Sequence, residues 1–436
     1  MKRLLIVAPR FAPSNAADGH RVRQSLPYYR ENGWEPTVLA VRPEEVAAPV
    51  DPFLLRTLPR DAEVVRVGAV PRAWTRRVGL GSLEARALVP LARAGGRLLR
   101  ERPFDAVFFS TTAMGVTALG PRWRRAHGVP FVVDLQDPWV NDYYARTGAP
   151  PPGGRLKYGL ARALAQRAEP AVLRRAAHVV AVSAAYPEAL AARYPWFSAD
   201  RATVLPFGAP ERDVEALRAA PVANPVFDRS DGLVHWAYVG RAGPDMAFAL
   251  SAIFGALAEA RRADPGRFER LRLHFVGTSY AEGGRARETV APVAARFGLG
   301  DVVEERPHRV PYAEALQILL DADALVVPGS DDPGYTASKL YPYVLARKPL
   351  LAVFHERSSV VGVLRDTEAG VVVPFASGEP AAAVAARVGA AWLADDRWRT
   401  PPATDWGAFG AYTARAMTRR QCEVFDGVVA QVPPET

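Results

Sequence analysis

Two carboxylates spaced three positions apart follow a short apolar run in the first half of the chain. Asp134 lies at the end of the run Phe131–Leu135, and Asp137 follows it, close to Trp139. An aromatic neighbour can desolvate a carboxyl group and tune its pKa for proton transfer. The structural alternative is a turn in which Asp137 caps the chain and Trp139 packs in the core. We predict that Asp137 and Asp134 are catalytic side chains.

A long loop follows the apolar run Leu4–Ala8 and ends at Gly19. A glycine at such a turn lets backbone N–H groups approach an anion, and a helix N-terminus favours negative charge. Positive charge is added there by His20, Arg21 and Arg23. No complete dinucleotide fingerprint or P-loop occurs in the chain, so an ordinary long loop is the alternative.

Two apolar runs of the second half end in small or basic residues. Gly240 and Arg241 follow the first of them, and Gly277 and Thr278 follow the second. An arginine beside glycines can bind a diphosphate through charge-assisted hydrogen bonds. We therefore predict a phosphate-binding edge in this half.

The densest polar segment, residues 328–341, leads from an apolar run into a helical pattern near Ser338. Hydroxyl and backbone N–H groups at a helix N-terminus favour an anion. Lys339 in the first turn is otherwise unfavourable there, because the helix dipole repels cations at that end. The predicted phosphate ligands of this segment are Tyr335, Thr336, Ser338 and Lys339.

Composition places these residues in a globular protein of two domains. A chain of 436 residues exceeds the size of one hydrophobic core, and 49% hydrophobic with 23% charged residues is ordinary for a soluble protein. The single cysteine, Cys422, excludes a disulfide framework and a Cys-cluster zinc site. The run Leu4–Ala8 is too short for a signal peptide and is ended by Pro9, so we expect a cytoplasmic protein.

Short apolar runs alternate with helical patterns along the whole chain, and the helices expected in the first half include Arg21–Glu31 and Leu83–Arg100. This alternation predicts right-handed βαβ units and parallel sheets. The strands expected in the first half are Leu4–Ala8, Thr37–Val41, Val64–Val67, Ala106–Ser110, Phe131–Leu135, Val179–Val182 and Thr203–Leu205. Those of the second half are Val234–Val239, Leu271–Val276, Val302–Glu304, Ala324–Val327, Leu350–Val353 and Val371–Val373. We expect domains at 1–207 and 233–404, a linker at 208–232 and C-terminal helices at 405–436.

In their order these features resemble the family 4 glycosyltransferases of the GT-B superfamily. The resemblance covers nearly the whole chain and rests on the segments DLQDPW, VSAAYPEAL, VLPFG, YVGRAG, HFVGTSY and SKLYPYVLARKPLLAV. It implies an α/β GT-B fold of two facing Rossmann-like, doubly wound parallel-sheet domains, with a C-terminal helix that crosses back to the first. It also implies transfer of a sugar from a nucleotide-diphosphate donor to a hydroxyl acceptor, with retention and without a metal or other cofactor.

The resemblance also assigns roles to single residues. Gly19 matches a glycine near the donor phosphates, and Arg241 matches a ligand of the diphosphate. Ser338 and Lys339 lie on the donor-phosphate segment. Arg309 and Val310 fall where a loop borders the nucleotide base. Asp137 lies in the loop that faces the reacting sugar.

The chain departs from the family at two glutamates that contact the donor sugar and the ribose. Gly334 and Pro342 occupy these positions, and Asp245 with Met246 replaces a lysine that often follows the glycine–arginine turn. Our leading hypothesis is an active transferase in the biosynthesis of a cell-surface polysaccharide or glycolipid. The alternative is a catalytically silent GT-B-like binding subunit of a glycan-biosynthesis complex, which the missing glutamates favour.

Charge suggests a further partner. Residues 1–210 carry 30 Lys+Arg against 17 Asp+Glu, a net charge of +13, whereas the whole chain carries +9. The segment Arg155–Arg167 places Leu156, Leu160 and Leu164 four positions apart among basic residues. A basic amphipathic helix can bind the inner face of an anionic cell membrane, and an ordinary helix with its apolar stripe on the sheet is the alternative. No nucleic-acid-binding module is present, so we expect a nucleotide sugar and a glycan or lipid-linked acceptor as partners.

Overall fold

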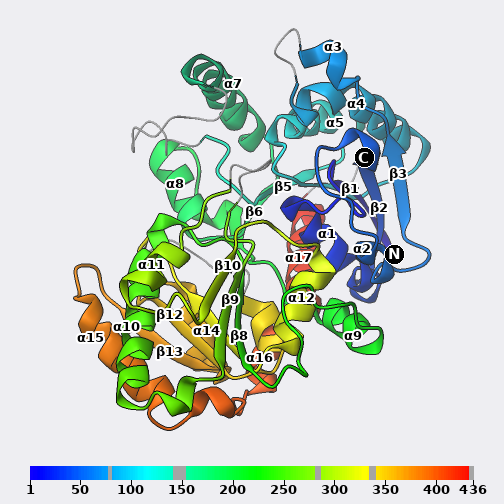
Figure 1. Ribbon diagram of the computed structural model, residues 1–436. Helices are drawn as coiled ribbons and strands as arrows, with labels where there is room; N and C mark the ends of the chain where they lie inside the picture. The colour runs from blue at the N-terminus through cyan, green and yellow to red at the C-terminus, as the bar shows by residue number, and fades with distance from the viewer. Residues whose placement is uncertain (77–80, 141–153, 280–285, 333–339, 432–436) are drawn as a thin grey trace. The chain divides into compact units, whose positions relative to one another are not determined.

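The chain divides into two compact units, each described here by itself. Unit 1 comprises Met1–Gly208 together with Ala414–Thr436, and unit 2 comprises Ala209–Thr413. The computed structural model describes residues 1–76, 81–140, 154–279, 286–332 and 340–431 (Figure 1). The segment expected as a linker, 208–232, contains helix α9 (Glu211–Ala219) and belongs to unit 2 from Ala209 onward.

The described residues of unit 1 form a seven-stranded parallel sheet in the order β3-β2-β1-β4-β5-β6-β7. Its strands are β1 (Lys2–Val7), β2 (Trp34–Val41), β3 (Glu63–Val67), β4 (Ala106–Ser110), β5 (Phe131–Leu135), β6 (His178–Ala181) and β7 (Ala202–Val204). Its helices include α1 (His20–Ser25), α2 (Phe53–Arg56), α3 (Arg72–Arg76), α4 (Leu83–Glu101), α5 (Leu119–His127), α7 (Arg155–Leu173), α8 (Ala185–Arg193) and α17 (Ala414–Ala430). The strand order reverses between β1 and β4, which makes their carboxyl ends the expected ligand edge.

Unit 2 repeats this plan with a six-stranded parallel sheet in the order β10-β9-β8-β11-β12-β13. Its strands are β8 (Val234–Val239), β9 (Leu271–Val276), β10 (Val303–Arg306), β11 (Ala324–Pro328), β12 (Leu350–His355) and β13 (Val371–Phe375). Its remaining helices include α10 (Ala247–Ala263), α11 (Ala291–Arg296), α12 (Tyr312–Asp321), α13 (Leu340–Leu345), α14 (Ser359–Thr367), α15 (Ala381–Val388) and α16 (Trp406–Phe409). The strand order reverses between β8 and β11.

The predicted strands are confirmed throughout, and the predicted fold class with them. The central strands β4, β11 and β12 are nearly continuous apolar runs, as expected where helices cover both faces of a parallel sheet. One predicted helix, Arg21–Glu31, is shorter than expected. It ends at Ser25, and 3-10 turns follow it from Leu26. Pro27 explains the difference, since proline lacks the N–H that a continuing helix requires.

Helix α17 follows unit 2 in the chain and packs within unit 1. Its buried side chains recur every three or four positions, which is the period of one helix face. They are Ala414, Met417, Thr418, Gln421, Cys422, Phe425 and Val428. The Phe425 ring lies 5.5 Å from that of Trp34 and 5.1 Å from that of Phe108. Burial of this face therefore completes the core of unit 1.

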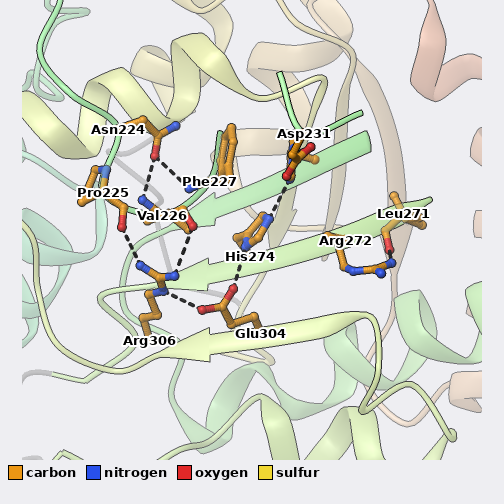
Figure 2. A network of polar contacts seen from close by, with 11 residues as sticks. Asn224, Pro225, Val226, Phe227, Asp231, Leu271, Arg272, His274, Glu304 and Arg306 are labelled. Carbon is orange, nitrogen blue, oxygen red and sulfur yellow. Dashed lines mark hydrogen bonds and ion pairs between the residues drawn. The ribbon is translucent and has the colours of Figure 1, made fainter. Parts of the chain in front are cut away.

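A chain of titratable side chains crosses one face of the unit 2 sheet (Figure 2). His235 Nδ1 lies 3.0 Å from His274 Nε2, and His274 Nδ1 lies 3.2 Å from Glu304 Oε2. The Phe227 ring stacks on both imidazoles, with ring centroids 4.3 and 5.0 Å away. Arg306 donates hydrogen bonds to Glu304 and to the carbonyl oxygens of Pro225 and Val226. These contacts attach the segment that precedes β8 to the sheet.

Burial of His274 should make unit 2 less stable at acid pH. Burial is the largest influence on its pKa, which falls from 6.5 to about 4. Between these values the unfolded chain binds a proton that the folded unit does not, so stability falls as the pH falls from about 6.5 to about 4. We expect a loss on the order of 2–3 kcal/mol in urea unfolding measured across this range.

The variant His274→Gln should lose this part of the pH dependence. His308→Gln, which removes an exposed histidine of the same unit, should keep it. Equal slopes of stability against pH for the wild type and His274→Gln would contradict the assignment.

No helix in the described part of the chain is long and apolar enough to cross a membrane.

Candidate functional site

The loop after β1 is held to the end of β4 by a buried aspartate. Asp18 Oδ2 accepts hydrogen bonds from Arg10 Nη1 at 3.0 Å, from the Thr112 backbone N–H at 3.0 Å and from the Thr111 hydroxyl at 3.1 Å. Asp18 is 3% exposed. The loop is therefore fixed at the reversal of strand order in unit 1.

Gly19 follows this aspartate and starts α1. Its φ of −78° is available to any residue, so the glycine is not required for its conformation. A Cβ atom at this position would lie 2.6 Å from the Arg10 carbonyl oxygen. This distance is too short for a van der Waals contact, and a backbone oxygen cannot easily move away. The close approach of two backbone segments thus explains the glycine, and the predicted role at a phosphate stays a prediction.

The predicted positive charge of α1 points into the protein instead of toward a ligand. Arg21 and Arg23 are 3% and 2% exposed. Arg21 donates to the carbonyl oxygen of Leu205, and Arg23 donates to the Thr57 hydroxyl. The expectation that these arginines add charge to an anion site was wrong, because both guanidinium groups are buried on internal partners.

Asp134 is completely buried at the end of β5. Its Oδ2 lies 2.8 Å from Arg21 Nε and accepts hydrogen bonds from the Ser110 hydroxyl and from Gln136 Nε2, each at 2.8 Å. Gln136 also donates to the carbonyl oxygen of Asp18. A carboxylate enclosed in this way holds α1, β4 and β5 together, and this geometry favours a positioning role.

Asp137 differs from Asp134 in its surroundings. It is an exposed residue of the loop after β5. Neighbouring protein atoms still remove part of its hydration, and this desolvation, with the Asp18 carboxylate as the second cause, raises the pKa of Asp137. The pKa of Tyr186 is raised by burial first and then by Asp137. Asp137 is therefore an exposed carboxylate with a raised pKa, which suits proton transfer.

The loop that carries Asp137 is anchored at Val140. Its N–H donates to Glu169 Oε1 at 3.3 Å, and its carbonyl oxygen accepts from Arg193 Nη2 at 3.2 Å. Glu169 lies on α7 and is 1% exposed. Two helices thus fix the start of the loop that follows the aspartate.

In unit 2 the turn after β8 carries the predicted arginine. Gly240 donates its N–H to the Val276 carbonyl oxygen, which aligns the ends of β8 and β9. The Arg241 guanidinium makes two hydrogen bonds to Asp245, Nη1–Oδ2 at 3.0 Å and Nη2–Oδ1 at 2.5 Å. About a third of each side chain is exposed. The predicted diphosphate ligand is therefore paired with an acid four positions later.

The turn after β9 is built around a second buried acid. Thr278 Oγ1 donates to Glu305 Oε1 at 2.5 Å, and Glu305 Oε2 accepts the backbone N–H groups of Val290 and Ala291 at 2.8 Å. Gly277 has a φ of +72°, the left-handed conformation that favours glycine. The Thr278 hydroxyl thus supports the start of α11, and the adjoining Arg309 is exposed and Val310 is partly buried.

The predicted phosphate ligands Tyr335, Thr336, Ser338 and Lys339 lie outside the described residues, as does Gly334. The flanks of this segment are described. Ser330 is 2% exposed and accepts the Asp332 N–H, and α13 begins at Leu340. Pro342, at the position of the expected ribose glutamate, is a partly buried residue of α13. Tyr343 of the same helix donates its hydroxyl to the Val239 carbonyl oxygen, which places α13 at the end of β8.

Several residues of these edges were missed in the sequence. The sequence held a usable signal for three of them. Asp18 stands next to Gly19, and Thr111 and Thr112 follow directly after a strand. Glu305 carried no such signal, because it lies inside a strand.

An open hollow of about 570 Å³ is bordered by residues 224–229, which precede β8, and by Asp321, which precedes β11. It therefore lies near the amino ends of these strands, away from the carboxyl edges described above. Among the described residues, no three His, Cys, Asp or Glu side chains are arranged to hold a metal ion.

Two parallel sheets of Rossmann-like order, each with polar side chains at its carboxyl edge, place the chain in the class of α/β proteins with two Rossmann-like units. Residues 19–208 match the family model described as "Glycosyl transferase 4-like domain". This match covers the first half of the chain alone, and it agrees there with the resemblance seen in the sequence.

Solved structures of similar fold span almost the whole chain. A glycosyltransferase from Rickettsia africae is 13% identical with a TM-score of 0.56 and 99% coverage of both chains. Anabaena Alr3699/HepE, in complex with UDP-glucose, is 16% identical with a TM-score of 0.54 and the same coverage. The α,α-trehalose 6-phosphate synthase of Burkholderia multivorans is 15% identical with a TM-score of 0.62, covering 99% of this chain and 97% of that one. At these identities the likeness shows the fold. A search of curated proteins finds no match.

Proposed function

We propose that the protein transfers a glycosyl group from a nucleotide-diphosphate sugar bound by unit 2 to a hydroxyl acceptor bound by unit 1. The observation that carries this proposal is the reachable Asp137 carboxylate at the ligand edge of a glycosyl transferase 4-like domain. In unit 2, Arg241 supplies positive charge that can stabilise the diphosphate leaving group as the glycosidic bond breaks. One fold neighbour, HepE, was solved with UDP-glucose, which supports a nucleotide sugar as donor.

The finer assignment is a retaining, metal-independent transferase of cell-surface polysaccharide or glycolipid biosynthesis, without a cofactor beyond its donor. Purified protein should hydrolyse or transfer at least one of a panel of UDP, GDP, ADP and dTDP sugars. We expect the same rate in EDTA, and the anomeric configuration of the product, read by NMR, should match that of the donor. If the protein neither hydrolyses nor transfers any sugar of the panel, the transferase assignment fails.

A catalytically silent binding subunit is the second candidate, because Gly334 and Pro342 stand where the resemblance implies two glutamates. Calorimetric titration with UDP and GDP separates the two candidates. Nucleotide binding with turnover supports the transferase, whereas absence of both, together with glycan binding, supports the subunit.

We further propose that unit 1 binds the inner face of an anionic membrane through α7. The alternative was an ordinary helix whose leucines pack on the sheet. It is contradicted for Leu160 and Leu164, which are 66% and 60% exposed. The helix buries Ala165, Val172 and Leu173 instead. Arg155 and Arg167 are exposed on the same helix, so apolar and basic groups occur together. This location fits a cytoplasmic enzyme with a lipid-linked acceptor.

Replacing both leucines should weaken this membrane binding. Insertion of a leucine side chain contributes about 1.5–3 kcal/mol, so Leu160→Ser with Leu164→Ser should lower binding to anionic vesicles at least tenfold in flotation at low salt. Leu55→Ser, which changes another exposed leucine of unit 1, should bind like the wild type. No flotation of the wild type with anionic vesicles would refute the proposal.

A further inference from the structure

The Arg241–Asp245 pair occupies the edge of unit 2 where the proposed donor diphosphate would bind. Both guanidinium nitrogens that face the acid, Nη1 and Nη2, are hydrogen-bonded to its two oxygens. This is the two-point geometry with which arginine also binds a phosphate. The backbone of Asp245 is tied to the loop after β11, because its carbonyl oxygen accepts the Asp331 N–H at 2.9 Å. The acid is thus held beside the arginine at the reversal of strand order.

The turn provides space for the pair to close. A Cβ atom at Gly243 would lie 2.2 Å from Arg241 Nη2 and 2.3 Å from Asp245 Oδ1. The φ of Gly243 is −92°, which any residue can adopt, so its backbone conformation does not require a glycine. The missing side chain lets the two charged groups meet directly above this residue.

The charges of Arg241 and Asp245 neutralise each other while the two side chains are hydrogen-bonded. Burial alone would raise the pKa of Asp245, but hydrogen bonds from Arg241 and Ser330 outweigh burial and hold it below its ordinary value. The carboxylate is therefore ionised at neutral pH. A diphosphate that approaches Arg241 meets this negative charge and must take over the hydrogen bonds that Asp245 accepts.

We propose that Asp245 is an internal competitor of the donor diphosphate for Arg241, so that it weakens the binding of donor and of nucleoside-diphosphate product alike. The inference rests on the proposed function, since it assigns Arg241 to the diphosphate. Partial exposure of both side chains suits the exchange, because an exposed ion pair contributes little and a multiply charged phosphate can displace it. Asp245 is then a residue that sets affinity, and it takes no part in the chemical step.

Calorimetric titration with UDP, GDP and inorganic pyrophosphate tests this assignment on the full chain. Asp245→Asn should bind the probe about tenfold more tightly than the wild type at the same ionic strength. Arg241→Ala should bind more weakly, and the gain from Asp245→Asn should vanish in the Arg241→Ala background.

Asp301 offers a matched control. It also accepts two hydrogen bonds from one arginine, Arg261, with Nη1–Oδ1 at 2.7 Å, and it precedes the amino end of β10. Asp301→Asn removes the same charge from unit 2 and should leave binding unchanged.

The outcomes separate the inference from the proposed function. Equal or weaker binding by Asp245→Asn, with a wild type that binds, overturns the inference alone, and weaker binding would indicate that Asp245 orients Arg241 for the phosphate. A gain shared by Asp301→Asn also overturns it, because general charge would then explain the effect. If neither the wild type nor Asp245→Asn binds any probe, the inference and the nucleotide-sugar assignment both fail.

Discussion

Replacement of Asp137 by asparagine should lower kcat by two to four orders of magnitude, the usual contribution of a positioned general base. Asparagine keeps the shape of the side chain and removes its ability to accept a proton. Asp137 is the exposed acid of the loop after β5, and its raised pKa brings it closer to the working pH. Steady-state transfer rates with saturating donor measure the effect, and the affinity for the nucleotide should stay the same.

The pH profile gives an independent readout of this role. A base must be deprotonated, so wild-type kcat should fall as the pH falls through the pKa of Asp137, which lies above that of an ordinary aspartate. The asparagine variant should lack this acid limb. Asp200→Asn, which removes an exposed carboxylate elsewhere in unit 1, should retain both the rate and the limb. A variant at Asp137 that keeps more than about a tenth of kcat would remove this residue from the chemical step.

Most of the fold was predictable because parallel strands have a strong local signature. Strands covered by helices on both faces form unbroken apolar runs in the sequence, such as Leu350–Val353, and tertiary context seldom changes them. Helix ends depended on single residues. The helix predicted over Arg21–Glu31 continues past Pro27, whereas α1 ends at Ser25, as the presence of a proline two positions later requires.

The sites were less predictable because their partners are distant in the sequence. Spacing placed Asp134 and Asp137 at one strand end, but burial of Asp134 depends on Arg21, which arrives from another βα unit. The role of Thr278 depends on Glu305, whose neighbour in the sheet register is Phe275 on the adjacent strand. The Arg241–Asp245 pair lies four positions apart in the sequence, and there the acid was noted as a departure from a family pattern.

Helix α7 shows a different limit. Its period correctly indicates that Leu160 and Leu164 share a face. The period alone does not determine whether that face meets the core or the solvent. Glu169, buried and paired with Arg193 at 2.8 Å, belongs to the inward face, so an ion pair occupies part of that face. The period therefore predicted that the leucines share a face, and only the packing of the folded unit showed that this face meets the solvent.

Replacement of Asp134 by asparagine should lower the stability of unit 1 by about 3–5 kcal/mol, the cost of leaving one partner of a buried ion pair without its counter-charge. The Arg21 guanidinium, whose side chain is 2% exposed, would keep its charge and lose the carboxylate at 2.8 Å. Urea unfolding measures the loss. Arg21→Met combined with Asp134→Asn should recover part of it, because the double variant leaves no uncompensated charge.

An exposed pair of the same unit supplies the contrast. Arg30 and Glu35 are hydrogen-bonded at 2.7 Å but are 41% and 35% exposed, so Glu35→Gln should cost less than about 1 kcal/mol. If Asp134→Asn lowers the free energy of unfolding no more than this control does, the ion pair with Arg21 does not stabilise unit 1. A direct catalytic role for Asp134 would then be favoured again. If it costs several kcal/mol while Asp137→Asn lowers kcat without loss of stability, the two acids have different functions: one fixes the strand ends, and the other acts on the acceptor.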